Sequence, residues 1–296
     1  MSSGLCSPKT AIHWIDVTCR AFGRCHCFGI KEGDSMQAWR IGLLILLFSG
    51  SALAVMQKEE VSYKDGDVTL KGYLFWDDAF SGKRPGILVA HEWWGLNDYA
   101  KLRAEMLAEM GYVAFAADMY GEGRNTRHAD EAKGWMQQIT SNIETWQRRA
   151  NLALEQLRSH PNVESTKLAA IGYCFGGATV MQMAYLGADL DGVVSFHGSL
   201  PPATPEQASK VKARVLVAHG DEDSFVPSER IEAFKKALSE AGVDWEMDIY
   251  AGARHSFTNP YSGGYGMEGL AYQEQADRRS WLRMLAFLEE LFEEPL

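Results

Sequence analysis

The sequence predicts an α/β protein with a mostly parallel β-sheet and helices on both faces of that sheet. From residue 85 onward, apolar runs of strand length alternate with helical patterns, which is the order of βαβ units. One of these runs passes into a helix through a Gly-x-Cys-x-Gly segment at residues 172–176. An acidic turn and a histidine follow two later strand patterns, at residues 220–223 and 255. Because parallel strands end at one edge of the sheet, we expect these groups to lie together.

The first 54 residues differ from the predicted single domain at residues 55–296. The apolar run 41–48 follows a basic residue and is followed by a small-x-small sequence, which predicts a secretory signal peptide over residues 36–54. Residues 1–35 are interpreted as an additional leader or a start placed too early, and are expected to be disordered. We therefore expect an exported protein, periplasmic or secreted, without a stable membrane anchor after cleavage. An uncleaved signal anchor is the alternative.

Cysteine usage supports a reactive thiol in the exported domain. Four of the five cysteines, Cys6, Cys19, Cys25 and Cys27, belong to the leader. Cleavage near residue 54 would leave Cys174 as the single thiol, so the mature domain could form no internal disulfide. An unpaired cysteine in an exported protein indicates a reactive or intermolecular thiol.

The domain begins with elements typical of a mixed sheet edge. Residues 61–76 contain two alternating stretches around a Lys-Asp-Gly-Asp turn at 64–67, which predicts an antiparallel hairpin. The continuous apolar run 85–91 predicts a buried strand. A helix is expected over 98–110, ended by a glycine, and a second buried strand over 112–118.

The middle of the chain predicts an insertion near the carboxyl edge of the sheet. Residues 120–127 are polar and rich in glycine, and one long helical pattern continues to about residue 159. We interpret this insertion as an entrance wall or partial lid over the site. The remaining elements expected in order are a strand at 167–173, a helix at 178–185, strands at 192–197 and 213–219, a helix after 228, a strand at 245–250 and a last helix from about 270.

Residues 172–177, Gly-Tyr-Cys-Phe-Gly-Gly, have the spacing of the nucleophile elbow of α/β-hydrolases, with sulfur in place of the usual hydroxyl oxygen. Glycines flank the nucleophile because the strand and the following helix approach closely there. A thiol at this position faces the helix N-terminus, whose free N–H groups favour thiolate. The alternative is a small buried cysteine that only fills space. The pattern predicts the α/β-hydrolase fold with Cys174 as the nucleophile.

A nucleophile of this kind needs a base and a group that orients the base. In α/β-hydrolases the chain order is nucleophile, acid, histidine. His255 follows the last predicted strand and is the expected base. Asp221 and Asp223 both lie in the acidic turn after the preceding strand, and spacing alone does not choose between them.

Three segments together resemble the dienelactone hydrolase family, also called carboxymethylenebutenolidases: Gly-Tyr-Cys-x-Gly-Gly, Asp-x-Phe-Val-Pro and Gly-x-x-His-Ser-Phe, in this order. The resemblance runs from about residue 61 to the C-terminus. It implies a triad of Cys174, Asp223 and His255. It also implies that Glu92, after the strand at 85–91, contacts the cysteine and helps to generate thiolate. The N–H groups of Trp93 and Phe175 would then bind the oxyanion.

The expected substrate is a small carboxylic ester or lactone, and the reaction passes through an acyl-cysteine. Tyr120 matches a family tyrosine near the pocket. Family members that act on dienelactone use arginines for its carboxylate, and Asn259 stands where one of them would fall. Arg124 or Arg127 could compensate. Further aromatic residues expected near the pocket are Trp94, Phe225, Phe257 and Tyr261.

Several other classes of function were weighed. A metal site formed by His91, His197 and His219 is conceivable at the strand ends, but paired ligand spacing is missing and no metal or cofactor is expected. The formal net charge of −10 has the wrong sign for nucleic-acid binding. A thiol redox protein using Cys174 and a non-catalytic binding protein of the same fold are the alternatives to a hydrolase. Oligomeric state is not predicted.

Overall fold

The computed structural model describes residues 55–293, and the strands of this part form one sheet. The predicted leader at 1–35 and signal peptide at 36–54 lie outside the described residues. The strands are β1 (Met56–Asp65), β2 (Val68–Asp77), β3 (Arg84–Ala90), β4 (Val113–Ala117), β5 (Val163–Tyr173), β6 (Gly192–Phe196), β7 (Arg214–Gly220) and β8 (Trp245–Tyr250).

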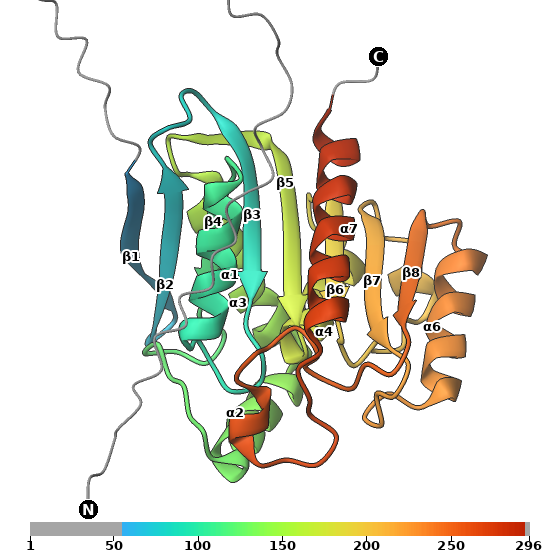
Figure 1. Ribbon diagram of the computed structural model, residues 1–296. Helices are drawn as coiled ribbons and strands as arrows, with labels where there is room; N and C mark the ends of the chain where they lie inside the picture. Colours follow the sequence, from blue (N-terminus) through green and yellow to red (C-terminus); the bar gives the residue numbers. More distant parts are fainter. Residues whose placement is uncertain (1–54, 294–296) are drawn as a thin grey trace, which may run out of the picture. The chain divides into compact units, whose positions relative to one another are not determined.

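The sheet order is β1-β2-β4-β3-β5-β6-β7-β8 (Figure 1). β1 and β2 form the expected antiparallel hairpin, and β2 pairs antiparallel with β4. All pairs from β4 to β8 are parallel. The mostly parallel sheet is therefore confirmed, and its parallel strands end at one edge, the lower edge in Figure 1.

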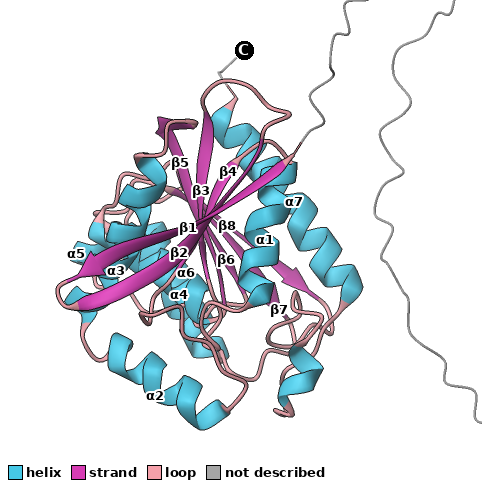
Figure 2. Ribbon diagram, turned by 90° about the vertical axis from the view of Figure 1, so that its left-hand side faces the viewer, coloured by secondary structure: helices cyan, strands magenta, loops and turns pink. Residues whose placement is uncertain are grey.

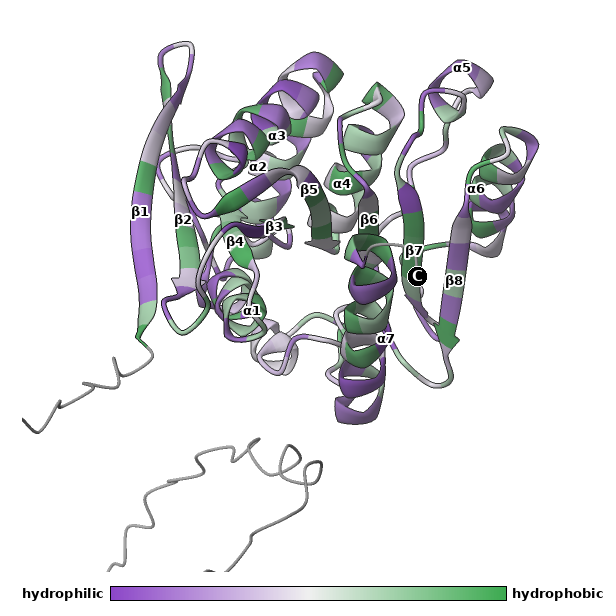
Figure 3. Ribbon diagram, turned by 90° about the horizontal axis from the view of Figure 1, so that it is seen from above, coloured by the Kyte–Doolittle hydropathy of each residue, from purple (hydrophilic) through white to green (hydrophobic). Residues whose placement is uncertain are grey.

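Helices cover both faces of the sheet, as the sequence predicts (Figure 3). One face carries α1 (Asp98–Glu109) and α7 (Glu274–Phe292). The other carries α3 (Ile143–Arg158), α4 (Phe175–Leu186) and α6 (Ser228–Glu240). Described helices of 18 residues or more include none that is apolar enough to cross a bilayer.

The parallel strands are apolar on both sides because both sides are covered. In β3, Leu88 and Ala90 pack into the core beneath α3 and α4, whereas Ile87 and Val89 pack beneath α1 and α7. All four side chains are fully buried. This explains why the sequence shows a continuous apolar run here instead of an alternating one.

The single long helix predicted up to residue 159 is wrong, because the chain forms two helices. α2 (Ala129–Thr140) ends before Asn142, whose side chain accepts a hydrogen bond from the Thr145 N–H and so begins α3. The lid interpretation also needs correction for α3. It packs as a layer helix on α4, while α2 lies beyond the carboxyl edge of the sheet (Figures 1 and 2). Two short elements, α5 (Pro205–Ala208) and the 3-10 helix η1 (Ser262–Tyr265), have no counterpart among the predictions.

Candidate active site

Cys174 stands at the turn between β5 and α4, in a backbone conformation that few residues adopt. Its φ of 55° and ψ of −113° lie outside the common regions for a residue with a side chain. The turn is held by the hydrogen bond from the Cys174 N–H to the Phe196 carbonyl, at 3.0 Å. Strained positions of this kind persist where the surrounding structure fixes them, as at active sites. The side chain is half-buried, so the thiol is accessible from the edge of the sheet.

The glycines around Cys174 are required by close contacts of the backbone. A Cβ atom on Gly172 would lie 2.0 Å from the Gly176 carbonyl oxygen. A Cβ on Gly176 would lie 2.1 Å from the Ala90 carbonyl oxygen, and one on Gly177 would lie 2.5 Å from Ser195 Oγ. The close approach of α4 to β3, β5 and β6 therefore explains why the motif has glycine at these positions.

His255 and Asp223 approach Cys174 from the ends of β8 and β7. The Nδ1 atom of His255 lies 2.7 Å from Asp223 Oδ2, and both side chains are buried. The other oxygen of Asp223 accepts the Phe225 N–H at 2.9 Å. Asp221 is exposed, so the structure selects Asp223 between the two candidates left open by spacing. Because an ionised carboxylate only accepts, His255 Nδ1 carries the proton and Nε2 is left for the thiol.

The electrostatics of this group favour a protonated imidazole on His255. Burial lowers the pKa of His255, but the charge of Cys174 and hydrogen bonds to Asp223 and Cys174 raise it to about 10. The sulfur of Cys174 thus lies near enough to the imidazole for its charge to raise the pKa of His255. An imidazolium beside a thiolate is the arrangement that activates a cysteine nucleophile.

Glu92 lies directly after β3 and is almost completely buried. Its two carboxylate oxygens accept hydrogen bonds from Ser256 Oγ and Asn259 Nδ2, each at 2.6 Å. Burial raises the pKa of Glu92, and these two hydrogen bonds oppose the rise. The structure thus gives Glu92 other hydrogen-bond partners than the expected Cys174. Asn259, at the position of the missing arginine, binds this carboxylate instead of facing a substrate.

Two backbone N–H groups point to an oxyanion site. Phe175 is the first residue of α4, so its N–H has no acceptor within the helix. Within residues 55–293 the N–H of Trp93 has no hydrogen-bond acceptor either. The rings of Phe175 and Trp146 stack at 5.5 Å, which fixes the start of α4.

Two residues predicted to contact substrate lie instead in the interior. Trp94 is fully buried, and its ring stacks on Tyr265 at a centroid distance of 3.9 Å. Phe257 is also fully buried and packs against Tyr250 in the core beneath α1 and α7. Both residues were expected at the pocket because they are close in sequence to the proposed catalytic residues. Neighbouring side chains in a tight turn point in different directions, so closeness in sequence did not place them there.

The other two predicted contacts have different surroundings. Arg124 is exposed, and its carbonyl accepts the Leu96 N–H at 3.1 Å. Tyr120 lies beside the site but is only 4% exposed, and its hydroxyl donates to the Trp93 carbonyl at 3.0 Å. Tyr120 thus binds the chain that forms the site, which differs from the substrate contact expected.

Two of the three strand-end histidines, His91 and His197, have hydrogen-bond partners in the protein. His91 Nδ1 lies 2.6 Å from the Glu92 carbonyl, and His197 Nε2 lies 2.7 Å from Thr258 Oγ1. Burial lowers the pKa of His219 as well as those of the other two. Within residues 55–293 no group of three or more His, Cys, Asp or Glu side chains could hold a metal ion.

Sequence reasoning missed the residues that support the segment after His255. Arg103 of α1 is buried and donates to the Thr258 carbonyl at 2.5 Å, and it forms an ion pair with Asp277 of α7. Ser256 is also buried, where it binds Glu92. No local signal marks Arg103, because it lies about 150 residues from its partner in the sequence. Phe225, by contrast, was expected near the pocket, and it is 43% exposed with its ring centroid 5.0 Å from that of His255.

Comparison with known proteins identifies the family of the chain. Over 204 residues, the chain is 29% identical to Protein usf of Aquifex pyrophilus, covering 67% of this chain and 86% of that protein. It is 41% identical to the dienelactone hydrolase-like promiscuous phosphotriesterase P91 from metagenomic libraries, with a TM-score of 0.78, covering 80% of this chain and 99% of P91. A dienelactone hydrolase from Anabaena variabilis, 23% identical, shares the fold with a TM-score of 0.55, covering 78% of this chain and 98% of that one. The model of the dienelactone hydrolase family matches residues 70–292, and the chain belongs to this family of α/β-hydrolases.

Proposed function

We propose that this hydrolase acts on carboxylic esters or lactones through an acyl intermediate on Cys174. The observation that carries the proposal is the alignment of three groups at the carboxyl edge of the sheet. Cys174 lies on the strained turn, His255 lies near enough for the charge of Cys174 to raise its pKa, and Asp223 holds the imidazole of His255 at 2.7 Å. A thiol, a base and an orienting carboxylate in this order form the arrangement that nucleophilic catalysis needs.

In the first half of the proposed reaction, the Cys174 thiolate attacks the carbonyl carbon of the substrate. The carbonyl oxygen becomes an oxyanion, which accepts hydrogen bonds from the N–H groups of Trp93 and Phe175. The C–O bond to the leaving group then breaks, and the leaving oxygen takes the proton from His255 Nε2. A thioester on Cys174 and an alcohol or enol are formed, with His255 neutral.

In the second half, water replaces the leaving group. Neutral His255 takes a proton from a water molecule as the water oxygen attacks the thioester carbon, and the same two N–H groups bind the oxyanion again. The C–S bond breaks, which releases the carboxylic acid and restores the thiolate beside imidazolium. Asp223 keeps the proton on Nδ1 throughout, so Nε2 alone exchanges protons with the substrate.

The chemistry of sulfur restricts the substrates that we propose. Thiolate is itself a good leaving group, so the tetrahedral intermediate reverts to starting material unless the departing oxygen is stable. Enol and aryl esters meet this condition better than alkyl esters or amides. Asn259 binds Glu92 and Arg124 points to solvent, so neither supports a clamp for a substrate carboxylate. We therefore propose activated esters or enol lactones, with Phe225 against the substrate.

A second candidate reaction is favoured by one comparison. P91, which is 41% identical over nearly its whole length, carries the description of a promiscuous phosphotriesterase. A phosphotriester with an aryl leaving group offers the Cys174 thiolate a phosphorus centre in place of a carbonyl carbon. The same leaving-group argument applies to it, because an aryl oxide departs readily.

The test compares the wild-type protein with Cys174→Ala on aryl esters, enol lactones, thioesters and an aryl phosphotriester. We expect ester turnover to fall by about a thousandfold or more in the variant. Mass spectrometry of wild-type protein during turnover should show the acyl group on the peptide that contains residue 174. Ester hydrolysis that persists in Cys174→Ala would refute the proposal, and peroxide consumption that depends on Cys174 would favour a thiol redox protein. Turnover of the phosphotriester alone would select the second candidate.

We also propose that the protein is exported and loses residues 1–54. The support is the pattern of the leader and the single cysteine that remains, Cys174, which suits an oxidising compartment. Edman sequencing of protein recovered outside the cytoplasm should begin near residue 55. A start before residue 36 would refute the cleavage.

A further inference from the structure

The Trp93 N–H lies in a short turn between β3 and α1, and two side chains tie this turn to the segment after β4. The first tie is the hydroxyl of Tyr120, which donates to the Trp93 carbonyl at 3.0 Å. The second is His91, whose Nδ1 lies 2.6 Å from the Glu92 carbonyl and whose Nε2 accepts the Met119 N–H at 3.3 Å. Both ties thus join the turn at residues 92–95 to residues 119 and 120.

The hydrogen bonds of His91 define its protonation. The Met119 N–H can only donate, so His91 Nε2 must be the acceptor and Nδ1 must carry the proton. That proton points to the Glu92 carbonyl. The imidazole is fully buried, and burial lowers its pKa, which agrees with this neutral form. His91 is therefore a fixed bridge between two backbone segments and is not free to act as a base.

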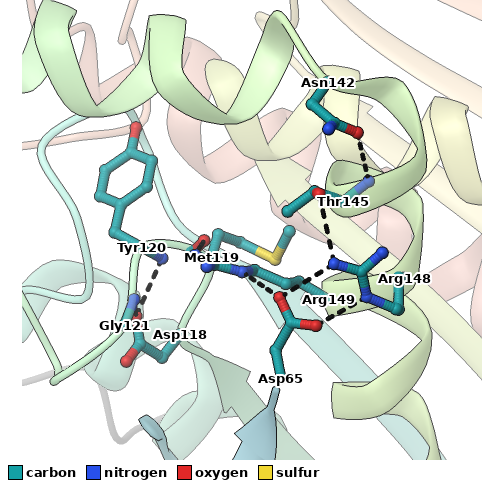
Figure 4. A network of polar contacts seen from close by, with 9 residues as sticks. All are labelled: Asp65, Asp118, Met119, Tyr120, Gly121, Asn142, Thr145, Arg148 and Arg149. Atoms are coloured by element: carbon teal, nitrogen blue, oxygen red, sulfur yellow. Dashed lines mark hydrogen bonds and ion pairs between the residues drawn. The ribbon is translucent and has the colours of Figure 1, made fainter. Parts of the chain in front are cut away.

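The segment after β4 is itself firmly held, as Figure 4 shows in part. The carboxylate of Asp118 accepts four backbone N–H groups at 2.8–3.0 Å, from Lys71, Tyr120, Gly121 and Gly123. Behind it, Arg149 of α3 donates to the Met119 carbonyl at 3.0 Å and pairs with Asp65 at 2.8 Å. Residues 119 and 120 thus form a rigid base for the two ties.

The same two side chains also touch the second half of the oxyanion site. The Tyr120 ring lies 5.4 Å from the ring of Phe175, and the His91 ring lies 5.9 Å from it. Tyr120 therefore links the Trp93 carbonyl to the ring of Phe175, and His91 links that ring to the Glu92 carbonyl, which shares a peptide unit with the Trp93 N–H. Neither side chain is exposed enough to hold a substrate, since they are 4% and 0% exposed.

We propose that Tyr120 and His91 are positioning residues that set the Trp93 N–H at its working distance from the Phe175 N–H. The proposal rests on the function proposed above, because it needs an oxyanion. Tyr120 acts through the Trp93 carbonyl, which belongs to the peptide unit next to the donating N–H. Removing its hydroxyl frees this peptide to rotate and turns the Trp93 N–H away from the oxyanion.

Two reactions of Cys174 separate this role from a general structural one. Acylation by an aryl ester forms an oxyanion and needs the donors. Alkylation by iodoacetamide displaces iodide from carbon and forms no oxyanion, so it reports only on the thiolate. Loss of one oxyanion donor lowers the rate by a factor of about 100 to 1,000, and a displaced donor should retain part of its effect. We expect Tyr120→Phe to slow acylation by about 10- to 100-fold and to leave alkylation within about twofold of wild type.

Tyr185→Phe is the matched control. Tyr185 is a similarly buried tyrosine whose hydroxyl donates to a backbone carbonyl, that of Pro201, at 2.9 Å. Its replacement should cost similar stability in urea unfolding and leave both rates unchanged. His91→Phe is the second variant at the site, and it should show the same split between acylation and alkylation.

The outcomes distinguish the two proposals. If wild type forms an acyl-cysteine and Tyr120→Phe acylates as fast as wild type, the positioning role is refuted and the proposed function stands. An equal loss of acylation and alkylation in Tyr120→Phe would also refute it, because a disordered site slows both. If wild type forms no acyl-cysteine with any ester, the proposed function itself fails.

Discussion

Gly176 offers a direct test of how the nucleophile turn is built. It is the second residue of α4, and a Cβ atom there would lie 2.1 Å from the carbonyl oxygen of Ala90 and 2.5 Å from its carbon. Both atoms belong to the backbone of β3, so no side-chain rotation can relieve the contact. In Gly176→Ala, the start of α4 must move away from the end of β3 by roughly 1.3 Å or more, because ordinary contacts of a Cβ atom begin at about 3.4 Å.

This displacement has two measurable consequences. Overpacking of a well-packed site costs about 1–3 kcal/mol of unfolding free energy. The N–H of Phe175 precedes Gly176 directly and moves with the helix start, away from an oxyanion whose other donor is on Trp93. A misplacement of about 1 Å can lower the rate about 100-fold. We therefore expect the ester kcat/KM of Gly176→Ala to fall about 100-fold while the fold persists.

The assay combines urea unfolding with ester kinetics, and Gly134→Ala is the control. Gly134 lies in α2 with no atom within 4 Å of an added Cβ. Alanine there should raise the unfolding free energy by about 0.5–1 kcal/mol and leave kcat/KM unchanged. A Gly176→Ala variant with wild-type stability and wild-type kcat/KM would refute the reasoning, since it would mean that α4 does not approach β3 as closely as described.

Two further predictions concern buried charges. Replacing Arg103 by Met leaves Asp277 without its ion-pair partner, so urea unfolding should show a loss of about 3–5 kcal/mol in unfolding free energy. The double variant with Asp277→Leu should recover part of this loss. Equal losses in the single and the double variant would contradict the pairing. The pKa of His255 is raised to about 10, so stabilisation by its protonated form is complete below its ordinary value of 6.5 and is lost as the pH rises through about 10. In NMR titrations of the histidine side chains, His255 should remain imidazolium at pH 8 in the wild-type protein. Cys174→Ala removes the largest of the effects that raise the pKa of His255, so the midpoint of its titration should fall in this variant. An unchanged titration midpoint would contradict an interaction between His255 and the charge of Cys174.

Much of the fold could be predicted because each signal is local. Apolar runs between helical patterns predicted the buried strands β3 to β7, and glycine at 111 correctly marked the end of α1. The break between α2 and α3 was missed, although Ser141 and Asn142 are poor helix formers and asparagine is a favoured N-cap. The side-chain cap of Asn142 begins α3.

The sequence alone predicted the nucleophile, the base and the strand ends from which they come, because a glycine-flanked elbow and the chain order nucleophile, acid, histidine are properties of the chain itself. Only the tertiary structure brought the Asp223 carboxylate to the imidazole of His255, gave Glu92 its partners Ser256 and Asn259, and turned Tyr120 toward the Trp93 carbonyl. The physical reason is that the direction of a side chain at the edge of a sheet depends on loops that meet from distant parts of the chain. Residue spacing does not predict contacts between such distant loops.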